Sequence, residues 1–215
     1  MDASALATRL GRWGVVPVVT IDDAAAAVPL ASALADGGLP VIEVTFRTPA
    51  AADAIAAIHE ALPEVLVGAG TILDAPTVDR ALHAGAAFVV APGLNPSVVE
   101  RTTLHGVPMI PGVVTPTEIE RALALGVELV KFFPAEAAGG ARYLRAVSAP
   151  YRAARFMPTG GINPGNLAEY LALPCVTVCG GTWIAPAEAI REGRWDAIRE
   201  AAAEAVSIAA PFTGA

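Results

Sequence analysis

Short runs of apolar, largely β-branched residues alternate along the chain with longer stretches in which apolar residues recur at helical spacing. The apolar runs predict strands over 15–19, 41–46, 65–70, 87–92, 107–113, 127–133, 154–161 and 175–181. The longer stretches predict helices over 22–36, 49–61, 75–84, 96–104, 116–125, 139–148, 164–171 and 195–208. Strands and helices that alternate in this way indicate parallel strands joined by helical crossovers.

The predicted strands show little alternation between polar and apolar positions, which is typical of strands buried on both faces. Repeated strand–helix units of this kind favour an α/β fold of the (β/α)8 TIM-barrel type. An open doubly wound sheet is the structural alternative, but it usually carries a glycine-rich nucleotide-binding loop after the first strand. Here residues 18–24 read VVTIDDA, without glycine.

Helix starts are marked by a capping residue before a proline, at Thr48-Pro49, Asn95-Pro96, Thr115-Pro116 and Asn163-Pro164. We find no linker or low-complexity stretch. We therefore expect a single domain over residues 1–215, in which residues 1–12 form an N-terminal helical extension.

Composition narrows the possible function. Hydrophobic residues make up 54% of the 215 residues, and the net charge is −7 without a run of basic residues, so nucleic-acid binding is not expected. No apolar stretch reaches the roughly 18 residues of a membrane span, and no basic region followed by an apolar one opens the chain. We expect a cytoplasmic protein.

Two cysteines, Cys175 and Cys179, stand four apart in the last predicted strand. Buried reduced thiols are the ordinary interpretation. A metal site would need further ligands close by in the sequence, and none is evident. We therefore predict no metal and no cofactor, and leave the role of the two thiols open.

Basic residues are distributed unusually, since the chain has thirteen arginines and a single lysine, Lys131, inside the predicted strand 127–133. Burial penalises the ammonium form and favours a neutral amine that can attack a ketone. The alternatives are a lysine that reaches out to solvent or one that pairs with a carboxylate. Because arginine would serve as a structural cation but forms no imine, the pattern favours a Schiff-base lysine.

Polar residues also end other predicted strands. Glu43, Thr45 and Arg47 share one face if that strand stays extended. Glu43 is then a candidate general acid and base, and Arg47 a candidate carboxylate clamp. A structural ion pair between Glu43 and Arg47 is the alternative.

Glycine pairs end the last two predicted strands, at Gly160-Gly161 and Gly180-Gly181. Backbone amides in such loops bind anions, and barrels frequently hold a phosphate there. The alternative is a pair of tight turns that require positive φ.

Seven motifs, taken together and in order, resemble the 2-keto-3-deoxy-6-phosphogluconate (KDPG) and 4-hydroxy-2-oxoglutarate (KHG) aldolase family. They are EVTFRT (43–48), GAGT (68–71), the Pro92-Gly93 turn, IPGV (110–113), KFFPAE (131–136), PTGGI (158–162) and GGTW (180–183), within a likeness running from about residue 8 to residue 206. The resemblance implies a metal-free (β/α)8 barrel that forms a homotrimer. It implies a class I aldolase that reversibly cleaves KDPG to pyruvate and glyceraldehyde 3-phosphate, with cleavage of KHG to pyruvate and glyoxylate as a second activity.

The matching motifs also imply roles for individual residues. Lys131 resembles the Schiff-base lysine and Glu43 the proton-transfer residue. Substrate contacts are implied for Arg47, Thr71, Pro92, Phe133, Thr159, Gly160, Gly161, Gly181 and Thr182. Thr182 stands where serine is more usual in the family, which keeps the hydroxyl and adds a methyl group.

Other functions remain as alternatives. The galactonate-configured substrate of the same reaction differs only in stereochemistry, which the sequence does not fix. A phosphate-binding barrel isomerase or epimerase would need a histidine or a second carboxylate at a strand end, and neither is present. A non-catalytic anion-binding barrel is the third alternative.

Overall fold

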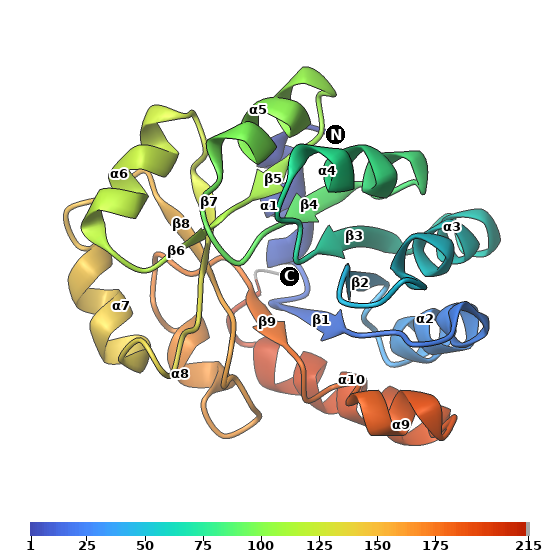
Figure 1. Ribbon diagram of the computed structural model, residues 1–215. Coiled ribbons are helices and arrows are strands. Elements are labelled where there is room, and N and C mark those ends of the chain that lie inside the picture. The colour runs from blue at the N-terminus through green and yellow to red at the C-terminus, as the bar shows by residue number, and fades with distance from the viewer. Residues whose placement is uncertain (214–215) are drawn as a thin grey trace.

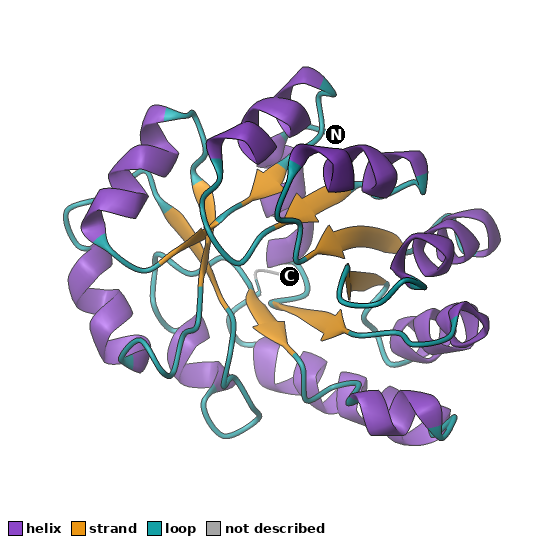
Figure 2. Ribbon diagram, in the orientation of Figure 1, coloured by secondary structure: helices purple, strands orange, loops and turns teal. Residues whose placement is uncertain are grey.

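The computed structural model describes residues 1–213, so the last two residues of the predicted domain, 214–215, lie outside the described residues. It is an α/β structure with strands in the middle and helices around them (Figures 1 and 2). The strands are β1 Val15–Val19, β2 Val41–Thr45, β3 Leu66–Gly70, β4 Phe88–Val90, β5 Met109–Ile110, β6 Gly112–Val113, β7 Leu129–Phe132, β8 Arg155–Pro158 and β9 Cys179–Gly181.

Most helices lie where the apolar spacing predicts them. They are α1 Ala3–Gly11, η1 Ala24–Ala26 (a 3-10 turn), α2 Ala27–Asp36, α3 Ala51–Ala61, α4 Ala75–His83, α5 Pro96–Leu104, α6 Pro116–Ala124, α7 Gly140–Ser148, α8 Leu167–Leu171, α9 Ala187–Arg191 and α10 Trp195–Ala209. The short helix α9 was not predicted, and α8 is shorter than expected. Within residues 1–213, no helix has both the length and the apolar character to cross a membrane.

Every strand pairing is parallel, as predicted, but the ladder is divided into two sheets. One sheet has the order β5-β4-β3-β2-β1-β9 and the other the order β6-β7-β8. The predicted strand 107–113 is split because Pro111, which has no N–H to donate, separates β5 from β6. Isolated parallel bridges join Phe156 to Val176 and Thr159 to Gly180. One continuous closed ladder, as expected for a full barrel, is therefore not seen.

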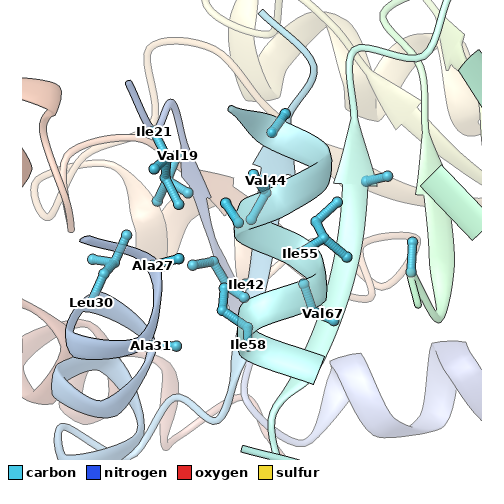
Figure 3. Packing of buried hydrophobic residues seen from close by; sticks show 14 of the residues in the cluster. Val19, Ile21, Ala27, Leu30, Ala31, Ile42, Val44, Ile55, Ile58 and Val67 are labelled. Atoms are coloured by element: carbon cyan, nitrogen blue, oxygen red, sulfur yellow. The ribbon is translucent and has the colours of Figure 1, made fainter. Parts of the chain in front are cut away.

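Alternate strand residues face two different cores, as strand geometry requires. Ile42 and Val44 of β2 point outward and belong to the same buried cluster as Ile55 and Ile58 of α3 (Figure 3). Val41 belongs to a separate cluster inside the ring of strands. A strand side chain of the same parity as Val41 is therefore placed in the interior.

Helix α1 belongs to the inner cluster. Asp2 caps it by accepting a hydrogen bond from the Ala5 amide at 2.7 Å. Leu6 and Leu10 are buried against inward residues near the amino ends of the strands, such as Val41. Helix α1 therefore covers the amino-terminal end of the strands and leaves the carboxyl end as the site of the loops considered next.

The predicted helix caps are correct at two of the four positions. Asn95 caps α5, and Thr115 caps α6 in a capping box with Glu118. At Thr48 the prediction is wrong, because α3 begins at Ala51 and the Thr48 hydroxyl donates to a backbone carbonyl instead. At Asn163 it is also wrong, because the side chain there holds a turn before α8 begins at Leu167.

Candidate active site

Lys131 and Glu43 meet inside the ring of strands, from β7 and β2 respectively. The Lys131 Nζ donates a hydrogen bond to Glu43 Oε1 at 3.2 Å. Only 6% of Lys131 and none of Glu43 is exposed. The structure therefore brings together the two residues singled out as nucleophile and proton-transfer group, although 88 positions separate them in the sequence.

Three alternatives are open for a lysine in this strand: a buried nucleophile, a side chain that reaches out to solvent, or a partner for a carboxylate. Lys131 does not reach out to solvent, and it does pair with a carboxylate. Glu43 lies within hydrogen-bonding distance of the amine and can accept its proton, which frees the nitrogen lone pair for attack.

Glu43 has one oxygen engaged and one free. Its Oε2 is buried and has no hydrogen-bond partner among residues 1–213, although buried acceptors are normally satisfied. At the end of β3, a Cβ on Gly70 would stand 2.2 Å from Glu43 Oε1. Gly70 is therefore needed for the carboxylate to fit. This role was not predicted, although a glycine inside a predicted strand is a signal of close approach by another group.

Arg47 is exposed, unlike this buried pair. Strand β2 ends at Thr45, whose buried hydroxyl donates to the Val19 carbonyl at 2.8 Å, and Arg47 follows in an exposed turn. The expected shared face of the strand therefore extends only to Thr45. The alternative of a Glu43–Arg47 ion pair is wrong, because Glu43 pairs with Lys131.

Arg47 and Thr71 line the same cavity, of about 400 Å³, at the carboxyl ends of β2 and β3. Arg80 also lines it, and its guanidinium lies 5.7 Å from the centre of the Phe46 ring. Thr71 has a φ of 60°, the one positive φ of a non-glycine residue within residues 1–213. Such strain concentrates at functional positions.

Phe133 and Pro92 lie near the lysine. The Lys131 Nζ is 5.4 Å from the centre of the Phe133 ring, close enough for a cation–π contact. Gly112 pairs in register with Lys131, and a Cβ on Gly112 would stand 2.0 Å from the Pro92 carbonyl oxygen. Both residues expected to line the pocket are therefore next to the amine or to its neighbouring strand.

Thr159 follows β8 and is 3% exposed. It pairs with Gly180 through a parallel bridge, and a Cβ on Gly180 would stand 2.3 Å from Thr159 Oγ1. Gly180 therefore provides the space that the Thr159 side chain fills. This contact also places the loops after β8 and β9 side by side.

The two glycine pairs are explained differently. Gly160 and Gly161 have φ values of 99° and 83°, so the tight-turn interpretation is correct for that pair. Gly180 and Gly181 do not have positive φ; Gly181 instead lies under Trp183, whose ring would be 2.4 Å from an added Cβ. Thr182 is exposed at the end of β9. The loops keep small residues at the carboxyl end of the strands, where a phosphate is expected.

Comparison with known proteins assigns this arrangement to a family. The profile of the KDPG and KHG aldolase family matches residues 6–201, which includes every strand. The chain belongs to the KDPG and KHG aldolase family. The resemblance drawn from the sequence motifs is therefore confirmed.

Individual members of this aldolase family are similar over most of their length. The 2-dehydro-3-deoxy-phosphogluconate aldolase of Treponema pallidum is 54% identical over 184 residues, covering 86% of this chain and 88% of its own. The KHG/KDPG aldolase of Escherichia coli K12 is 45% identical over 192 residues, with 89% and 90% covered. The crystal structure of the Legionella pneumophila KDPG aldolase, with pyruvate captured as a covalent carbinolamine, has a TM-score of 0.88 at 39% identity, with 92% and 96% covered.

In this member of the KDPG and KHG aldolase family, Glu136 lies beside the first glycine pair. An added Cβ on Gly161 would meet the Glu136 side chain at 2.5 Å. The hydroxyl of the fully buried Tyr170 donates to the Glu136 carboxylate. Burial first, and the Glu136 carboxylate second, raise the pKa of Tyr170 far above its usual value, so it stays a donor. No sequence pattern indicated this contact, which holds Glu136 against the loop.

The two cysteines of this family member have different environments. Cys179 is fully buried, and burial raises the pKa of its thiol, as expected for an inert core thiol. Cys175 is half-buried. The two thiols are therefore not equivalent, and only Cys175 is partly accessible to solvent.

Proposed function

We propose that this protein is a class I aldolase that reversibly cleaves KDPG to pyruvate and glyceraldehyde 3-phosphate through an imine on Lys131. The observation that carries the proposal is the buried amine 3.2 Å from the Glu43 carboxylate. A nucleophile within hydrogen-bonding distance of a base is the arrangement that covalent catalysis requires. The named activities of the relatives support the same reaction.

The chemistry follows from this pair. Glu43 accepts a proton from Lys131, and the freed amine adds to the C2 ketone. Glu43 returns this proton to the carbinolamine hydroxyl, which leaves as water and gives a protonated imine. That cation takes up the electron pair of the C3–C4 bond, while Glu43 accepts the proton of the C4 hydroxyl and the aldehyde leaves. Glu43 then donates this proton to C3 of the enamine, and water hydrolyses the resulting protonated imine to pyruvate and the Lys131 ammonium. The unpartnered Oε2 of Glu43 is available for these proton transfers.

Substrate binding is proposed for the surrounding residues. Arg47 holds the carboxylate through its guanidinium, with Thr71 in the same cavity. Pro92, Phe133 and Thr159 line the pocket around the Lys131 amine. The phosphate is bound by backbone amides and the hydroxyl at Gly160, Gly161, Gly181 and Thr182. KHG is proposed as a second substrate, because a relative carries both activities in its name.

We propose further that the two sheets form one closed (β/α)8 barrel within a single domain. The support is chain continuity from β5 to β6 and the parallel bridges from β8 to the chain around β9. As the family resemblance implies, we propose a homotrimer acting in the cytoplasm on a small keto-acid phosphate. Light scattering at several protein concentrations tests the trimer.

The test of the imine is borohydride trapping with pyruvate, followed by mass spectrometry. Wild-type protein is expected to gain a reduced pyruvate adduct on Lys131. In Lys131→Arg, which keeps the charge but forms no imine, we expect no side-chain adduct and no turnover. As a matched control, Arg142→Lys adds a second, exposed lysine, and we expect the adduct to stay on Lys131.

Normal turnover by Lys131→Arg would reject the imine mechanism. Absence of any adduct in the wild-type protein would favour an isomerase, an epimerase or a non-catalytic barrel. Initial rates with the gluconate-configured, galactonate-configured and unphosphorylated substrates then rank the substrates within the family.

A further inference from the structure

A second cavity, of about 420 Å³, lies at the opposite end of β8 from Thr159. Strand β8 begins at Arg155, and the last turn of α7 contributes Arg145. The polar residues that line the cavity are Arg145, Ser148, Tyr151, Arg152, Arg155 and Cys175. The cavity therefore lies at the amino-terminal end of the strands, away from Lys131.

The charge around this cavity is opposite to that of the whole protein. Residues 137–168 contain four arginines and no aspartate or glutamate, although the protein carries a net charge of −7. No basic run is visible in the sequence because the arginines are spaced apart, and the fold gathers three of them around one cavity. The lining of the cavity contains no carboxylate.

The three arginines are not neutralised by neighbouring acids. Within residues 1–213, none of them lies within 4.0 Å of a carboxylate oxygen. Arg155 donates from Nη1 to the Arg152 carbonyl at 3.2 Å, which fixes its guanidinium and leaves further N–H donors unused. Glu120 accepts a hydrogen bond from the Tyr151 hydroxyl at 2.9 Å but does not line the cavity.

We propose that this cavity is an anion-binding site, separate from the catalytic site, that takes a small, multiply charged oxyanion. Guanidinium groups match phosphate and carboxylate oxygens through paired N–H donors. The volume falls within the range of small-molecule sites. The three arginines line one cavity and form no ion pair among residues 1–213, so such a ligand would supply the opposing charge. The ligand is a phosphate ester or a polycarboxylate, which share this chemistry.

Cys175 provides a local probe, because it lines the cavity and is half-buried, whereas Cys179 is fully buried. The experiment measures the rate of Cys175 alkylation by iodoacetamide, by mass spectrometry, with inorganic pyrophosphate or citrate added at constant ionic strength. A ligand with a Kd of about 1 mM slows the reaction about tenfold at roughly 10 mM, since only the free protein reacts. We expect protection of this size from at least one of the two anions.

Matched variants locate the site. Arg145→Gln and Arg152→Gln, made singly, are expected to lose most of the protection. Arg142→Gln, on the same helix but outside the lining, is expected to keep it. Circular dichroism and the Tm establish that each variant is folded, and a single variant that folds is sufficient for the comparison.

Protection by pyrophosphate alone identifies a phosphate ligand, protection by citrate alone a polycarboxylate, and both outcomes support the site. Absence of protection by either anion would overturn the proposal. Equal protection in the wild-type protein and in the two cavity variants would also overturn it. The readout requires no turnover and no imine, so its failure is distinguishable from failure of the aldolase assignment.

Discussion

Replacing Gly70 by alanine tests whether the position of Glu43 controls the chemistry. The added Cβ would stand 2.2 Å from Glu43 Oε1, whereas ordinary contact begins at 3.4 Å, so the carboxylate must move by about 1.2 Å. Glu43 is fully buried, and its Oε1 bonds to Lys131 at 3.2 Å, so this movement disrupts the pair. Overpacking of this kind costs about 1–3 kcal/mol of stability, and misplacing a catalytic group by about 1 Å costs about 10²-fold in rate.

The assay is pyruvate formation from KDPG, coupled to lactate dehydrogenase, together with thermal unfolding. We expect kcat to fall about 10²-fold, and the Tm to fall by about 2–4 °C for each kcal/mol lost. Gly11→Ala is the matched control, because an added Cβ there meets its neighbours at 3.6 Å, an ordinary contact. That variant should keep full activity. A folded Gly70→Ala protein with wild-type kcat would refute the reasoning.

Three further predictions concern proton transfer, capping and pH. Glu43→Gln should still trap pyruvate but exchange the methyl protons of pyruvate about 10²-fold more slowly, as followed by NMR in D2O. An unchanged exchange rate would exclude Glu43 as the proton-transfer residue. Thr115→Ala removes the capping box of α6 and should lower the free energy of unfolding in urea by about 1 kcal/mol. Thr103→Ala, on the surface of α5, should be nearly neutral. Equal effects of the two substitutions would contradict the capping account. Burial alone would raise the pKa of Glu118, but hydrogen bonds from Thr115 and Val114 hold it below its usual value of 4.5. Because the folded pKa is the lower one, the stability from this carboxylate is present above about pH 4.5 and is lost as the pH falls through the folded pKa. The difference in unfolding free energy between wild type and Glu118→Gln should therefore shrink in acid. A difference independent of pH would contradict this role of the Glu118 carboxylate.

The order of strands and helices was predictable because it depends on local periodicity. Strand β2 shows where prediction from local periodicity fails. The alternation rule placed Glu43 and Thr45 on one face correctly, but it could not show that the strand ends at Thr45 and turns Arg47 outward. The residue at which a strand ends is set by tertiary contacts, such as the hydrogen bond from the Thr45 hydroxyl to the Val19 carbonyl. No local sequence pattern reveals such contacts.

The candidate site was predictable in its chemistry but not in its pairings. A single lysine in an apolar strand pointed to Lys131, and an acid in a buried strand pointed to Glu43. These two side chains bond to each other because both point into the interior of the ring of strands, and this arrangement depends on the tertiary fold. The roles of Gly70 and Gly180 were likewise hidden, because a glycine that makes room for another side chain looks the same in sequence as one that makes a turn.

The solitary lysine has a practical consequence for handling the protein. With 6% of Lys131 exposed, the surface of the described chain offers amine-directed reagents no lysine of its own. Esters used to attach dyes or to couple proteins to a solid support would therefore react with the terminal amine. Attachment would be uniform in orientation, and would leave the interior nitrogen free to report on ligands.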